Sequence, residues 1–129
     1  MGFVIVFLGA GVGGTFRHAI NLMVANLFGL GFPWATLSIN ILGSFLMGVL
    51  TEMFVTRTGL PQELRLFLTT GILGGFTTFS TFSLDAVGLW ERGELSAAIF
   101  YAGASVLVAF VAVFAGMILV RSVVGGQAI

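Results

Sequence analysis

The chain of 129 residues contains no lysine and no cysteine, and charged residues make up only 8% of it. The absence of cysteine excludes a disulfide framework, a thiolate zinc site and a cysteine nucleophile. Five arginines are balanced by five acidic residues, so the chain has no basic patch for nucleic acid phosphates and no nucleic acid partner is expected. A soluble domain is about one quarter charged. So few charges cannot cover a water-facing surface.

Hydrophobic residues, in contrast, make up 58% of the chain, and the mean hydropathy is +1.15. A membrane-spanning helix needs about 20 apolar residues. Four such spans account for nearly the whole length, and we expect them at residues 3–28, 33–56, 62–89 and 95–121. The sequence therefore predicts an all-α integral membrane protein, with one four-helix transmembrane domain over residues 1–129 that lies in the lipid bilayer.

The third predicted span contains an irregular segment, GILGGFTT, at residues 71–78. Three glycines followed by two threonines disfavour a regular helix, so we expect this helix to be broken at its centre. Irregular backbone at membrane depth is tolerated only where it is buried in protein or lines a water-filled cavity. Such a break exposes both N–H and carbonyl groups, so it is a candidate ion site that leaves the sign of the ion open.

Polar side chains recur inside the predicted spans, where they are costly without partners. Asn40 shares one helix face with Thr36 and Ser44, and its amide either bonds a neighbouring helix or donates to a ligand. Phe79 and Phe82 also share a face, and they either pack or offer their positive ring edges to an anion. Hydroxyl groups on the third and fourth spans extend this polar set: Ser80, Thr81, Ser83, Tyr101 and Ser105.

Arg17 lies inside the first predicted span. Because it follows the apolar run that begins at Met1, we interpret that run as a retained span, not as a cleaved signal peptide. The arginine either extends to an interface or supplies positive potential to a vestibule. The GxGxxG pattern at residues 9–14 lacks the strand and the acidic residue of a dinucleotide site. With a single histidine and no paired carboxylates in the membrane, we expect no enzymatic activity.

Charge and small residues bear on orientation and assembly. One side of the four-span arrangement carries Arg57, Arg65 and Arg121, and the other carries Arg92 and, depending on its position, Arg17. Three basic residues against one or two do not strongly choose an orientation, which is compatible with insertion in both directions. Gly9 and Gly13 form a GxxxG pair that either packs within the chain or supports an oligomer, most simply a dimer.

Three segments together resemble the CrcB/Fluc family of fluoride channels. They are the glycine-rich residues 9–18, PWATLSINILGSF at 33–45 and GILGGFTTFSTFS at 71–83. The resemblance extends over essentially the whole chain. It implies an antiparallel, dual-topology homodimer in the cell inner (plasma) membrane, with two pores through which fluoride leaves the cytoplasm passively.

The resemblance also implies residue roles. Asn40 would donate to fluoride, and Phe79 and Phe82 would offer ring edges. The implied pathway also includes further side chains from the third and fourth spans: Thr81, Ser83, Tyr101 and Ser105. Backbone carbonyls of Gly74 and Thr77 from both subunits would hold a structural sodium ion.

Two other classes remain open. A small dual-topology, proton-coupled transporter would need a carboxylate on the first span, whereas the first acidic residue is Glu52. A non-transporting membrane scaffold would have no use for the polar and aromatic set around Asn40.

Overall fold

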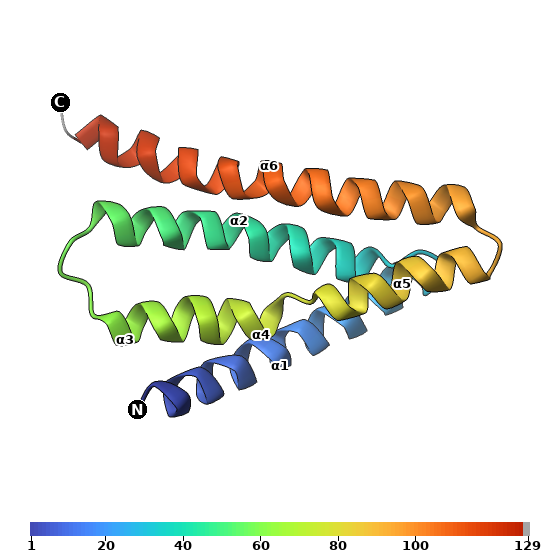
Figure 1. Cartoon of the computed structure of the whole chain (residues 1–129), viewed down its shortest axis with the longest axis horizontal. Coiled ribbons are helices and arrows are strands. Elements are labelled where there is room, and N and C mark those ends of the chain that lie inside the picture. The colour runs from blue at the N-terminus through green and yellow to red at the C-terminus, as the bar shows by residue number, and fades with distance from the viewer. Residues whose placement is uncertain (128–129) are drawn as a thin grey trace.

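The computed structural model describes residues 1–127, and all of its regular elements are helices (Figure 1). In chain order they are α1 (Gly2–Phe28), α2 (Trp34–Thr56), α3 (Gln62–Arg65), the π-helix η1 (Leu66–Leu73), α4 (Gly74–Phe76), α5 (Phe79–Glu91) and α6 (Leu95–Gln127). Four stretches are long and apolar enough to cross a membrane, namely α1, α2, the run Gln62–Glu91 and Leu95–Gly125 of α6. The prediction of an all-α membrane protein with four spans is therefore confirmed.

Short turns join the spans and make sequence neighbours antiparallel (Figure 1). Each of the three turns contains a glycine with positive φ, a conformation that other residues rarely adopt: Gly29, Gly59 and Gly93. The N-terminus, the turn between α2 and α3 and the C-terminal end of α6 lie at one end of the molecule. The other two turns lie at the opposite end. The third span ends at Glu91, later than the predicted 89, and α6 continues to Gln127, beyond the predicted 121.

The third span changes its packing partner where it is interrupted. Before the interruption, η1 and α4 pack against α1, whereas α5 beyond it packs against α6. Helix α2 runs along α6 and touches the third span on both sides of the interruption. The third span is thus in contact with all three other spans, α1, α2 and α6.

The break in the third span lies at two threonines, and the glycines before it are helical. Thr77 has ψ 161° and Thr78 has φ −153° and ψ 118°, which are extended conformations, while Gly74 has helical φ −62° and ψ −37°. The prediction of a break within residues 71–78 is confirmed, and the structure places it at the two threonines of that segment and not at its glycines.

Close packing explains the glycines instead. A Cβ atom on Gly9 would lie 2.8 Å from the Cα of Gly71, and one on Gly75 would lie 2.5 Å from the carbonyl oxygen of Ala10. Helix α1 and the third span therefore touch backbone to backbone, which only residues without a side chain permit. Gly9 and Gly13 are both buried against this span, so the GxxxG pair packs within the chain.

Large apolar side chains cover the outside of the molecule. Phe3 is 94% exposed, Phe7 76% and Phe114 64%. In water, such an extended apolar surface would cause association, whereas in a bilayer it is the surface that faces lipid. The core is small in comparison and is built around Tyr101, Ile39 and Leu89.

Candidate functional site

The break is held by the side-chain amide of Asn40 on α2. Asn40 Nδ2 donates to the carbonyl oxygen of Thr78 at 2.9 Å, and the Thr78 N–H donates to Asn40 Oδ1 at 2.8 Å. The amide therefore pairs with both backbone groups of one residue, in the way that an adjacent β-strand would. One of the two Nδ2 hydrogens is used in this pair, and the other remains available to a ligand.

Local hydrogen bonds on either side of Thr78 complete the break. Thr78 Oγ1 accepts from the N–H of Thr81 at 3.1 Å and so caps the first turn of α5. The N–H of Thr77 still donates to the carbonyl of Leu73 at 3.0 Å, so α4 is satisfied up to that residue. The sequence TT at 77–78 therefore ends one helix and caps the next.

The interruption deprives the backbone carbonyls of residues 74–77 of their regular helical donors, and the fate of two of these donors is recorded. In a continuous helix, the N–H of Thr78 would bond the carbonyl of Gly74 and that of Thr81 would bond the carbonyl of Thr77. Both N–H groups are bonded elsewhere, to Asn40 and to the Thr78 hydroxyl. Carbonyl oxygens are the ligands that hard cations prefer, so Gly74 and Thr77 fit the chemistry of a sodium site.

Arg17 approaches the same break from α1. Its Nη1 donates to the carbonyl oxygen of Thr77 at 3.4 Å. The ion pairs within residues 1–127 are those of Arg92 with Glu94 and of Arg121 with Glu52, and neither includes Arg17. An arginine at mid-span without a carboxylate partner is costly in a membrane, which makes Arg17 a candidate functional residue.

A groove with a volume of about 330 Å³ opens beside the break. Asn40, Phe79, Phe82 and Ser105 all line it, so the structure brings together four of the predicted pathway residues. Its other lining residues come from α2, the break and α6: Gly43, Ser44, Met47, Thr77, Thr78, Val106, Ala109, Phe110 and Val113. The groove thus combines a few polar groups with apolar and aromatic walls, which is the usual character of a binding site.

Ser105 contributes a hydroxyl with an unusual environment. The residue is 7% exposed, and its Oγ has no hydrogen-bond partner within the described residues 1–127. Buried hydroxyls almost always have a partner, so this atom is a candidate donor for something that enters the groove.

Tyr101 lies behind Phe82 and does not line the groove. It is 0% exposed, and its hydroxyl donates to Asp85 Oδ2 at 3.2 Å. Its ring packs against Phe82 at 5.3 Å and, edge-on, against Phe32 at 5.5 Å, while Phe82 in turn contacts Phe79 at 5.5 Å. A row of rings therefore leads from the groove toward the turn between α1 and α2. Sequence reasoning did not assign Phe32 to this row, nor Asp85 as the partner of the Tyr101 hydroxyl, since these contacts join different helices and turns.

The two predicted pathway residues with hydroxyl groups on α5, Thr81 and Ser83, do not line the groove either. Ser83 Oγ donates to the carbonyl of Phe79 at 3.0 Å, within its own helix. Thr81 is exposed, and its backbone N–H serves the Thr78 cap. Of the four predicted pathway residues that carry a hydroxyl group, Ser105 is therefore the one that lines the groove.

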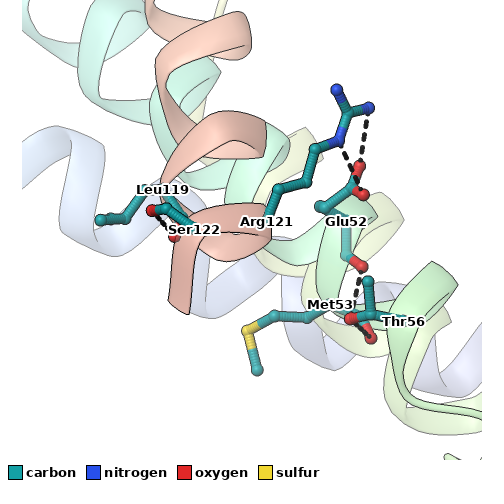
Figure 2. A network of polar contacts seen from close by, with 6 residues as sticks. All are labelled: Glu52, Met53, Thr56, Leu119, Arg121 and Ser122. Carbon is teal, nitrogen blue, oxygen red and sulfur yellow. Dashed lines mark hydrogen bonds and ion pairs between the residues drawn. The ribbon is translucent and has the colours of Figure 1, made fainter. Parts of the chain in front are cut away.

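Glu52 and Arg121 form a second polar cluster, at the end of the bundle that holds the N-terminus (Figure 2). The Arg121 guanidinium donates through Nε to Oε1 at 3.0 Å and through Nη2 to Oε2 at 3.2 Å. Glu52 is 7% exposed, and the pair fastens α2 to α6 in the paired, two-bond geometry that arginine favours. The carboxylate is committed to this pair and lies outside the groove.

The fold and the groove define a small multi-pass helical membrane protein with a polar site at mid-span. Residues 4–117 match the family model described as CrcB-like protein, Camphor Resistance (CrcB), and the chain belongs to this family. A relative from Granulibacter bethesdensis, named fluoride-specific ion channel FluC, is 52% identical over 98% of this chain and 99% of its own length. Relatives of the same name from a Methylobacterium species and from Agrobacterium fabrum are 55% and 51% identical, over 91% and 92% of this chain and 94% of their own length. In bacteria, such a multi-pass protein lies in the plasma membrane.

Proposed function

We propose that this chain is a fluoride-specific ion channel that exports cytoplasmic fluoride passively. The observation that carries the proposal is the groove in which the Asn40 amide, the unpaired Ser105 hydroxyl and the two phenyl rings meet. The relatives that are named fluoride-specific ion channels, at about half identity over nearly the whole chain, support the same ion.

The physical argument concerns dehydration. Moving a small ion from water into a low-dielectric medium costs on the order of 20 kcal/mol, so a selective pathway must replace the lost water with donors. The free Nδ2 hydrogen of Asn40 and the Ser105 hydroxyl are neutral donors, and Phe79 and Phe82 add positive ring edges. The unneutralised charge of Arg17 gives the surroundings the positive potential that an anion needs.

The pathway continues from the groove toward the turn between α5 and α6. Thr81 and Ser83 on α5 and Tyr101 on α6 lie in that direction along their helices. Tyr101 contributes its ring through the contact with Phe82 while its hydroxyl is bonded to Asp85.

The active form in this proposal is an antiparallel, dual-topology homodimer with two pores. Four helices leave the site as a groove that is not enclosed, and a second copy would supply the missing wall. Carbonyls of Gly74 and Thr77 from both subunits would hold a structural sodium ion, whose charge stabilises oxygens that the helix no longer uses. The chain's own contribution is the Asn40 amide, which bonds the Thr78 N–H and so removes the helical donor of the Gly74 carbonyl.

The proton-coupled transporter is the less favoured alternative. Such a mechanism needs a titrating carboxylate in the transport path, and α1 contains no acidic residue. Glu52 lies outside the groove and is paired with Arg121. Asp85 is bonded to the Tyr101 hydroxyl and does not line the groove either, so no carboxylate of residues 1–127 is positioned in the groove to carry a proton.

Fluoride efflux from liposomes that contain the purified protein tests the proposal. A fluoride electrode follows release after valinomycin supplies potassium as the counter-ion, and parallel liposomes are loaded with chloride. We expect rapid fluoride release and no chloride release. If verified, folded protein releases no fluoride, the channel proposal is wrong.

A further inference from the structure

The carbonyl oxygen of Thr77 has two candidate cationic partners, the guanidinium of Arg17 and the proposed sodium ion. The carbonyl of Thr77 accepts from Arg17 Nη1 at 3.4 Å, and the same carbonyl is one of the two assigned above to a sodium ion. Its normal helical donor, the N–H of Thr81, is bonded to the Thr78 hydroxyl. The oxygen therefore has no helical donor, and the partner recorded for it within residues 1–127 is the guanidinium of Arg17.

We propose that Arg17 and the sodium ion are alternative partners of the Thr77 carbonyl, so that Arg17 is a positioning residue of the break. The inference rests on the proposed sodium site. Without sodium, the guanidinium holds the carbonyl in its outward orientation. With sodium bound, the guanidinium leaves the carbonyl, and all five of its N–H donors become free for an anion.

Electrostatic repulsion disfavours the simultaneous binding of the Arg17 guanidinium and a sodium ion to the Thr77 carbonyl. A carbonyl oxygen has two lone pairs, so it has room for two partners, but two positive charges that share one oxygen lie only about 5 Å apart. At the intermediate effective dielectric of a partly buried site, this repulsion weakens the binding of the second cation by roughly tenfold or more. No carboxylate within ion-pair distance of Arg17, among residues 1–127, offsets that repulsion.

The rest of the break does not need Arg17. The Asn40 amide already fixes both backbone groups of Thr78, and the Thr78 hydroxyl caps α5. A purely structural arginine here would duplicate these bonds at the high cost of a charge at mid-span. A guanidinium that exchanges with a metal ion accounts for a charge that the fold itself does not require.

Thermal unfolding of the detergent-solubilised protein against sodium concentration tests the inference, with N-methylglucamine as the replacement cation. We expect Arg17→Gln to lower the sodium concentration at half-maximal stabilisation by about tenfold, because the repelling charge is gone. In sodium-free buffer, the same variant should melt below the wild-type protein. A merely structural role would lower the melting temperature equally with and without sodium. Arg92→Gln, which changes the arginine bonded to Gly31 and Glu94, is the matched control and should leave the sodium midpoint unchanged.

A second measurement uses the wild-type protein and so does not depend on a variant's folding. The ¹⁵Nε–H resonance of Arg17, assigned by its loss in Arg17→Lys, should shift during a sodium titration with the midpoint of the thermal series. A resonance that stays in place while sodium stabilises the protein would overturn the role of Arg17 and leave the sodium site intact. If sodium stabilises the wild-type protein no more than N-methylglucamine does, the sodium site itself is wrong and the inference falls with it.

Discussion

The side-chain amide of Asn40 bonds both backbone groups of Thr78, as donor at 2.9 Å and as acceptor at 2.8 Å. This pair lets a membrane-embedded helix stop and start again without leaving the N–H or the carbonyl of Thr78 unpaired. By accepting from the Thr78 N–H, the amide also removes the helical donor of the Gly74 carbonyl. A single side chain on α2 therefore fixes both backbone groups of the residue at which the third span is interrupted.

Asn40→Asp tests this relationship. The aspartate keeps an acceptor for the Thr78 N–H but places an oxygen against the Thr78 carbonyl, so we expect a loss of about 1–3 kcal/mol in the free energy of unfolding. Fluoride flux should fall as well, because the donor of the groove is lost. Denaturation in detergent and liposome efflux measure the two effects. Asn26→Asp, on the exposed side of α1, is the control, and an unchanged fluoride flux in Asn40→Asp would contradict the role of Asn40 as a donor.

The backbone contact between α1 and the third span predicts a contrast between two glycines of one helix. In Gly9→Ala, the new methyl group would meet the Cα of Gly71 and the carbonyl of Phe67, both at 2.8 Å, whereas in Gly11→Ala it would meet nothing within 4 Å. We expect Gly9→Ala to destabilise by about 1–3 kcal/mol through overpacking. Gly11→Ala should be neutral or stabilising by up to about 1 kcal/mol, from helix propensity. Equal melting temperatures of the two variants would show that the helices do not pack as described.

Phe79 and Phe82 supply the aromatic wall of the groove, and their exchange for leucine separates ring chemistry from apolar packing. We expect Phe79→Leu and Phe82→Leu each to slow fluoride efflux by about tenfold or more, since leucine has no positive edge to replace an interaction of about 1.4 kcal/mol. Phe7→Leu is the matched control, because Phe7 is 76% exposed and Phe79 77%, but Phe7 lies outside the groove. If both groove variants release fluoride at the wild-type rate, the two rings are not part of the fluoride pathway.

The ion pair of Glu52 and Arg121 should contribute to stability and not to transport. Arg121→Gln leaves a carboxylate that is 7% exposed without its partner, so we expect a loss of about 1–3 kcal/mol in stability. Changing Glu52 to Gln in the same protein should recover part of this loss, as a double-mutant cycle would reveal. Arg92→Gln breaks an exposed pair whose side chains are 50% and 49% accessible, and it should cost less than about 1 kcal/mol. Loss of fluoride flux in Glu52→Gln, with retained folding, would instead favour a proton-coupled transporter.

The sequence alone determined the class of the molecule and most of its layout. Apolar runs of the length that a bilayer requires defined the four spans, because a bilayer leaves few alternatives to a helix of that length. Helical spacing also placed Asn40 on a polar face and Phe79 beside Phe82, and three of the predicted pathway residues line the groove with Ser105. Tyr101 does not line the groove, because its ring packs behind Phe82. Helix periodicity does not reveal such an intervening side chain, and the role of Tyr101 in the pathway stays a prediction.

Only the tertiary structure decided which polar groups meet. Asn40 and Thr78 are 38 positions apart, Arg17 and Thr77 are 60 apart, and Glu52 and Arg121 are 69 apart. Such pairs depend on how whole helices pack, which no local spacing encodes. The glycines before the break illustrate the same limit: their low helix propensity suggested a break, but contact with α1 uses their small size instead. The helix stops two residues later, because that is where a side chain of α2 is positioned to take over the backbone hydrogen bonds.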